Sequence, residues 1–104
     1  MNKKCSYEGE FKNDLKEGLG MYIWASGNYY KGYYKGDLRD GYGEMYWADH
    51  SHYKGNWHLG LQHGYGILID QTTGEVKKGL FEQGKFICEC TEEEVLTGKY
   101  KQLD

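Results

Sequence analysis

Residues 28–47 read NYYKGYYKGDLRDGYGEMYW, a segment in which tyrosines crowd against glycines with hardly an aliphatic residue between them. Aromatic residues are favoured in β-strands and glycine is disfavoured there, so the two residue types oppose each other within one short segment. The conflict disappears if the segment belongs to a periodic structure in which each residue type has a fixed position. A repeat along the chain would provide such positions.

A 23-residue repeat runs through most of the chain. Tyr7, Tyr30 and Tyr53 begin three copies, and each is followed at the same offsets by a glycine, an aromatic residue, a leucine and a pair of glycines. A fourth copy begins near Lys77 and stops at Phe86 without its glycine pair. The glycines at the repeating positions are Gly9, Gly18, Gly20, Gly32, Gly41, Gly43, Gly55, Gly64 and Gly66.

Each copy contains two runs of strand length. The first runs, at 7–12, 30–35 and 53–58, alternate aromatic and polar residues, which is the period of a half-exposed strand. Short loops follow at 13–14, 36–37 and 59–60, and the second runs lie at 20–24, 43–47 and 66–69. The pattern predicts an all-β fold, a single-layer antiparallel β-meander with one hairpin per copy and about seven strands.

The free-energy cost of glycine in such strands requires a compensating gain. Each glycine in a strand costs about 0.5–1 kcal/mol relative to alanine, so nine of them cost roughly 5–9 kcal/mol. That sum is comparable to the whole stability of a small domain. We therefore predict that each glycine provides space for an aromatic ring that lies flat across its backbone.

The composition predicts one domain with an unusual core. The 104 residues include 11 Tyr, 3 Trp, 3 Phe and 16 Gly, and no Pro. Disordered chains are poor in aromatic residues, so the low hydropathy does not indicate disorder here. A chain this short with few aliphatic residues is not expected to fill a two-layer core, and ring packing in a single layer is predicted instead.

The charge of the chain argues against nucleic-acid binding. Residues 1–87 hold 11 basic and 11 acidic residues, so the net charge of −3 comes from the five acidic and two basic residues of 88–104. Binding to nucleic acid requires a basic face, which this distribution does not provide. The first residues lack the apolar run of a signal peptide or anchor, and the odd number of cysteines fits a reducing compartment. We expect a cytoplasmic protein.

No grouping of residues indicates catalysis, a metal or a cofactor. Cys88 and Cys90 would face the same side of a strand, as two half-buried thiols at a sheet edge, and the four histidines are scattered over two repeats without zinc-site spacing. The carboxylates recur at repeating positions, and the glycine pairs lie on strands instead of before helices, unlike a phosphate loop. We expect neither an enzyme nor a bound cofactor.

The segment TEEEVLTG at 91–98 carries the signals of a short helix. Thr91 is a suitable N-cap, Glu94 three residues later completes a capping box, and Gly98 is a stop signal. Because the ends of repeat arrays need covering, this helix is predicted to close the C-terminal end of the sheet.

The repeat resembles the MORN (membrane occupation and recognition nexus) repeat. YEGEFKN at 7–13 followed by GLG at 18–20, and YKGNW at 53–57 followed by GYG at 64–66, match the pattern of that family. We accordingly divide the chain into a MORN-repeat domain over 1–90, with repeats at 7–29, 30–52 and 53–76 and a partial one at 77–90, and a capping helix and tail over 91–104. Asp70 and Lys77 replace aromatic residues of the pattern, which predicts a weaker trough toward the C-terminal end.

The resemblance implies a twisted, open sheet with a concave trough lined by rings, and a binding or scaffolding role of the kind found in cytoskeletal, ciliary and membrane-junction assemblies. The predicted partner is a protein that offers a peptide, a helix or a second copy of the chain. An exposed apolar patch of a few hundred Å² usually marks an interaction site. The predicted contact residues are Phe11, Tyr22, Trp24, Tyr30, Tyr34, Trp47, Tyr53 and Trp57. In a single-layer sheet the same rings are also expected to form the core of the domain.

Several alternatives stay open. Phospholipid binding would require surplus lysine on one face, but Lys31, Lys35 and Lys54 stand beside acidic residues. Aromatic rings on a flat sheet also stack on carbohydrates, and the chain could be an accessory part of a larger enzyme or scaffold. The unpaired first strand and the partial last copy predict self-association, as a homodimer or end to end.

Overall fold

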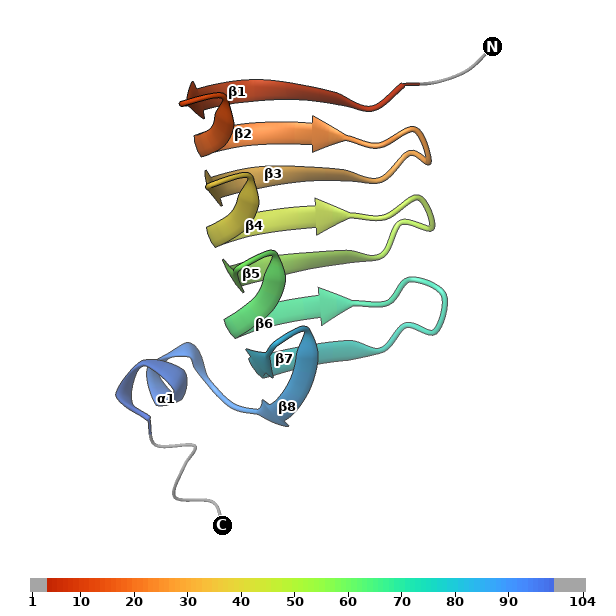
Figure 1. The fold of residues 1–104 in the computed structure, drawn as a ribbon. Helices are drawn as coiled ribbons and strands as arrows, with labels where there is room; N and C mark the ends of the chain where they lie inside the picture. Colours follow the sequence, from red (N-terminus) through yellow and green to blue (C-terminus); the bar gives the residue numbers. More distant parts are fainter. Residues whose placement is uncertain (1–3, 99–104) are drawn as a thin grey trace.

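The computed structural model describes residues 4–98, which form one open antiparallel sheet and one short helix (Figure 1). The eight strands follow each other in the sheet in the order of the sequence. The predicted single-layer antiparallel meander is therefore confirmed. The elements are β1 Ser6–Lys12, β2 Leu15–Ile23, β3 Tyr29–Lys35, β4 Leu38–Tyr46, β5 His52–His58, β6 Leu61–Ile69, β7 Val76–Glu82, β8 Lys85–Glu89 and α1 Glu92–Thr97.

The sheet has one strand more than the repeat pattern suggests, and its second strands are longer. The partial fourth copy still forms β8, which pairs with β7 although it lacks the glycine pair. The strands β2, β4 and β6 begin directly after the two-residue loops and end before Trp24, Trp47 and Asp70. The tight turns explain the greater length of these strands. Both residues of each loop have positive φ, so the two strands of a hairpin can pair from the residues next to the turn.

The two glycines of each pair are required for different structural reasons. Gly41 has a φ of 98° and lies where three residues of β4 face one residue of β3, so it is the left-handed residue of a bulge. Gly43 has ordinary strand geometry, but any side chain there would overlap the ring of Tyr30. The predicted role of the glycines as space for rings is thus correct for the second glycine of each pair and wrong for the first.

The repeating tyrosines lie flat over the glycines and are anchored by their hydroxyls. The Tyr30 ring crosses Gly32 and Gly43 on two paired strands, and its hydroxyl donates to the carbonyl of Tyr33 at 2.9 Å. Tyr53 repeats the arrangement, with its hydroxyl on the carbonyl of Asn56 at 2.8 Å. A ring in this position stays hydrogen-bonded while it covers the backbone of the sheet, so its burial leaves no polar group unpaired.

The core is a continuous row of edge-to-face rings. Tyr30 contacts Tyr34 at 5.2 Å and Trp57 at 5.5 Å between ring centroids, with interplanar angles of 81° and 88°. Contacts of this kind contribute about 0.5–1.5 kcal/mol each beyond the buried area. They recur from each repeat to the next, so the row stands in for an aliphatic core. In order along the sheet, the rings are Phe11, Tyr7, Tyr34, Tyr30, Trp57, Tyr53, Phe81 and Phe86.

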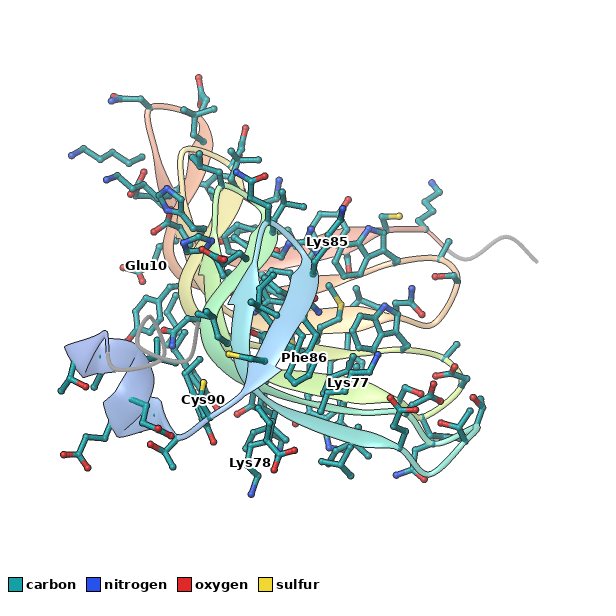
Figure 2. The ribbon with its side chains drawn as sticks, turned by 90° about the horizontal axis from the view of Figure 1, so that it is seen from below. Glu10, Lys77, Lys78, Lys85, Phe86 and Cys90 are labelled. Carbon is teal, nitrogen blue, oxygen red and sulfur yellow. The ribbon has the colours of Figure 1, made fainter. Side chains whose placement is uncertain are left out.

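The sheet is strongly curved, which gives it two different faces. Figure 2 shows Phe86 and Lys77 on the inner side of the curve, whereas Glu10, Lys78 and Cys90 lie on the outer side. The row of rings lies on the inner side, which we call the concave face. We call the outer side the convex face.

The helix α1 forms as its end signals predict. Thr91 accepts a hydrogen bond from the Glu94 amide, the Glu94 carboxylate accepts one from the Thr91 amide, and Gly98 ends the helix with a φ of 76°. Its position differs from the prediction, because it packs mainly on β6 and β7 on the convex side instead of along the free edge of β8 (Figure 2). The rest of the predicted tail, 99–104, lies outside the described residues.

Candidate functional site

Two hollows on the concave face occupy equivalent positions in successive repeats. The first measures about 160 Å³ and the second about 320 Å³. Trp24 of the first corresponds to Trp47 of the second, 23 residues later, and Leu38 corresponds to Leu61 in the same way. The first is lined by Lys16, Tyr22, Trp24, Tyr34, Asp37, Leu38, Arg39 and Gly60, and the second by Arg39, Met45, Trp47, Trp57, Gly60, Leu61, Gln62 and Gly84.

A cation stands among the rings beside each hollow. The guanidinium of Arg39 lies 4.6 Å from the centre of the Trp57 ring and donates to the carbonyl of Gly60 at 2.8 Å. The ammonium of Lys16 lies 5.3 Å from the Tyr22 ring and 3.7 Å from a carboxylate oxygen of Asp37. Aromatic rings stabilise such cations, so positive charge is held at the surface of an apolar face.

All eight predicted contact residues lie on the concave face, but they divide into core and surface. Tyr30 and Tyr53 have no exposed surface, and Tyr34 and Trp57 are buried as well. Tyr22, Trp24 and Trp47 are half-buried, and Phe11 is 61% exposed at the β1 end of the face. Only this second group presents rings that a partner could touch.

Burial also changes the acidity of the core tyrosines. It raises the pKa of Tyr34 to about 12, against a lowering influence of the nearby Arg39. Burial likewise raises the pKa of Tyr30 and Tyr53. These rings are therefore neutral at physiological pH, as a core requires.

The residues that sequence reasoning missed are the cations and the leucines at the rim. Leu38 and Leu61 follow the two-residue turns and stay 43% and 48% exposed, while Lys16 and Arg39 follow a leucine in successive copies. The signal for them was present, because Lys16 and Arg39 stand nine residues after the tyrosine that begins each copy. The repeat alone does not place them among the rings, because a charge in a core is unusual.

The trough changes toward its C-terminal end. Asp70, which replaces a tryptophan, accepts hydrogen bonds from the Thr72 hydroxyl and from the amides of Thr72 and Thr73, and these bonds lower its pKa. Lys77, which replaces a tyrosine, lies 3.5 Å from a carboxylate oxygen of Glu75. The hollows of the first two positions therefore have no counterpart of the same composition here, although the row of rings continues through Phe81.

The other candidate residues form no centre within the part of the chain that the structure describes. Cys88 is half-buried and Cys90 is buried, with its thiol directed at the Cys88 carbonyl at 3.8 Å. Among residues 4–98, no three His, Cys, Asp or Glu side chains are placed to hold a metal ion. Over the same residues, no helix is long and apolar enough to cross a membrane.

The fold and the hollows define a class of protein, an open repeat sheet that carries one β-hairpin per repeat and a continuous row of packed aromatic rings on its concave face. The sequence model of the MORN repeat matches residues 7–29, 30–52 and 53–72. The chain therefore belongs to the MORN repeat family, whose members often serve in binding or scaffold roles. The comparison with curated proteins finds no match.

Proposed function

We propose that the chain is a protein-interaction module whose concave face binds an apolar segment of a partner protein. The observation that carries this proposal is the pair of equivalent hollows, each with a half-buried tryptophan, a leucine at the rim and a cation among the rings. A site that repeats along a rigid array is suited to a ligand with a repeat of its own.

The spacing of the hollows indicates the shape of the partner segment. Neighbouring strands lie about 4.8 Å apart, so positions one repeat apart are separated by roughly 9.6 Å. A helix rises about 1.5 Å per residue, and side chains seven residues apart are roughly 10.5 Å apart on one face. A plain extended strand advances about 10 Å in three residues, but these side chains point to opposite faces. A helix that carries apolar side chains at i and i+7 therefore fits the two hollows best.

The cations indicate the polar part of the partner. Lys16 and Arg39 stand beside the apolar surface of Trp24 and Trp47. A carboxylate on the partner, next to its apolar side chain, would meet a positive charge that is already partly removed from water. The rings behind the hollows are held in the core row, so little conformational entropy is lost when a partner docks.

The test uses the tryptophans, which all lie on the concave face at Trp24, Trp47 and Trp57. After a partner is captured from cell lysate and its binding segment is mapped, its addition is expected to shift the tryptophan fluorescence. Trp47→Phe and Trp24→Phe, at the half-buried rings of the two hollows, are expected to weaken binding several-fold, because tryptophan is the residue at which binding energy most often concentrates. Lys54→Ala, on the convex face, is the matched control and should matter little.

Two results would contradict the proposal. If Lys54→Ala and Lys31→Ala abolish binding while the ring variants do not, the rings serve only as a core and the partner recognises charge on the convex face. If anionic vesicles or glycans bind with higher affinity than any captured protein, a lipid or carbohydrate role replaces the protein-binding one.

A further inference from the structure

The convex face carries a separate hollow of about 550 Å³ over β1 to β4. Its floor is the backbone of the strands, and two rows of side chains form its walls. A volume of this size lies within the usual range of binding clefts. The lining residues are Glu8, Gly9, Leu19, Gly20, Met21, Lys31, Gly32, Tyr33, Tyr42 and Glu44.

Strand pairing places this hollow on the outer side of the curve. Lys31 pairs with Met21 and Glu44, and the same cross-strand row runs on to Lys78, which points outward in Figure 2. The hollow is therefore separated from the tryptophans of the concave face by the sheet itself.

The same face is covered at its other end. The Tyr33 position pairs with Leu19 in one repeat, and the equivalent Leu80 pairs with Tyr65 two repeats later. The helix α1 packs on β6 and β7, and Leu80 there is 3% exposed. Tyr33 is 49% exposed and Leu19 54%. The open hollow thus continues a surface on which this chain already seats a helix.

The two ends of this face differ in charge. The covered end carries Lys78 in the central row, and α1 has three acidic residues in its first turn. The open end carries Glu8 and Glu44 around Lys31 in that row. With two carboxylates and one lysine, the open end favours a segment whose charge is opposite in sign to that of α1.

The carboxylate of Glu44 is held in place by hydrogen bonds. The hydroxyls of Tyr46 and Tyr42 donate to its two carboxylate oxygens at 2.7 and 3.2 Å. These hydrogen bonds, that of Tyr46 foremost, lower the pKa of Glu44 together with the nearby Lys54 and Lys31, although burial acts in the opposite direction. The carboxylate is thus ionised and oriented, and the Tyr42 ring beside it is 49% exposed.

We propose that this convex hollow binds a basic, apolar segment of a partner protein, with an arginine or lysine on Glu44 and an apolar side chain against Leu19 and Tyr33. A cation between a fixed carboxylate and exposed tyrosine rings gains a charge-assisted hydrogen bond and a cation–π contact together. The site is independent of the concave hollows, because the sheet separates the two and the sign of the recognised charge is opposite.

The test follows two methionines on opposite faces. Met21 lines the convex hollow and Met45 the second concave hollow. The full chain, with ¹³C-labelled methionine methyl groups, is titrated with a short acetylated and amidated peptide of alternating leucine and arginine. The Met21 methyl signal is expected to shift while the Met45 signal and the tryptophan fluorescence stay unchanged. The matched peptide with glutamate for arginine is expected to leave the Met21 signal unchanged.

Variants of the hollow assign the contact. Glu44→Gln is expected to lower the affinity for the arginine peptide roughly tenfold, which corresponds to about 1.4 kcal/mol. Tyr33→Asn, which copies the residue at the equivalent position 56, is expected to weaken binding as well. Glu82→Gln removes an exposed carboxylate outside the hollow and is expected to leave binding unchanged.

Four results would overturn the proposal. They are an equal shift of Met21 by the glutamate peptide, a shift of Met45 in place of Met21, an affinity for the arginine peptide unaffected by Glu44→Gln, and a Met21 signal that moves with protein concentration alone. The last result would assign the hollow to a second copy of the chain. Circular dichroism of each variant shows whether the sheet is retained. A failure of this proposal does not affect the proposed concave site, because binding at that site is monitored separately by tryptophan fluorescence.

Discussion

The concave and convex faces are made from the same strands but carry opposite kinds of surface. On the concave face, rings such as Tyr30 and Trp57 contact each other edge to face and are buried without any second layer above them. On the convex face, exposed rings such as Tyr33 and Tyr42 stand beside charged side chains. Curvature explains the difference, because side chains on the inner side of a bent sheet converge and those on the outer side diverge.

This comparison shows how a single sheet can be stable with few aliphatic residues. The concave face buries its own rings, so it contributes the core and only its remaining surface is left for a partner. The convex face contributes little to the core except beneath α1, where Leu80 is buried. Substitutions of the buried rings on the concave face should therefore lower the stability of the fold, whereas substitutions of the exposed rings on the convex face should change it little.

The largest expected effect is the loss of a core ring. Trp57→Ala should lower the free energy of unfolding by about 3–5 kcal/mol, because it leaves a cavity between Tyr30 and Tyr53. Tyr33→Ala, on the convex face, should change it by no more than about 0.5 kcal/mol. Urea denaturation followed by circular dichroism measures both. Similar losses for the two variants would mean that the faces share the core equally.

A pH-dependent effect is expected in alkaline solution. The pKa of Tyr34 is raised to about 12 by burial, and those of Tyr30 and Tyr53 are raised too, whereas exposed tyrosines in the unfolded chain ionise near 10. Below pH 10 these groups are protonated in both states, so stability does not depend on them. Above pH 10 the unfolded chain loses protons first, and stability should fall by about 1.4 kcal/mol per pH unit for each buried tyrosine.

The alkaline prediction has a simple control. Tyr34→Phe keeps the ring but removes one ionisable group, so the fall in the denaturation midpoint between pH 10 and about 12 should be less steep. If the variant and the parent lose stability in parallel, Tyr34 is not protected from ionisation. Water would then reach the rings of the concave face more readily than their buried surface indicates.

The smallest expected effect concerns the edges that both faces share. Within residues 4–98, the strands β1 and β8 each pair with a neighbour on one side only, and an open edge can pair with another chain. We expect weak, concentration-dependent association in sedimentation velocity. Phe11→Lys, which places a charge on the exposed edge strand β1, should reduce the association. A strict monomer at the highest attainable concentration would show that the edges are protected in solution.

The repeat, the hairpins and the helix could be read from the sequence because each depends on residues close together in the chain. The two-residue turns lie where the pattern places them, at 13–14, 36–37 and 59–60. The capping box of Thr91 and Glu94 formed as predicted. The stacking of rings on Gly32 and Gly43 also followed from the period, since paired strands bring equivalent positions together.

Other features depended on several repeats at once. The strand β8 forms because β7 offers a free edge for pairing, although the fourth copy lacks the glycine pair of the other copies. The seat of α1 on β6 and β7 depends on a curved face that no short segment describes. The bulge at Gly41 was hidden for a similar reason, because a glycine that relieves a backbone conformation looks the same in sequence as one that makes room for a ring.

By itself, the sequence determined the period, the hairpin in each repeat, the family and which of the repeating aromatic residues share a face, because these follow from residue types at fixed local offsets. Only the tertiary structure decided which rings are buried, where Lys16 and Arg39 stand among them, and that the convex face holds a hollow with Glu44 at its wall. The physical reason is curvature, which sums small twists over many strand pairs and so determines which side chains converge.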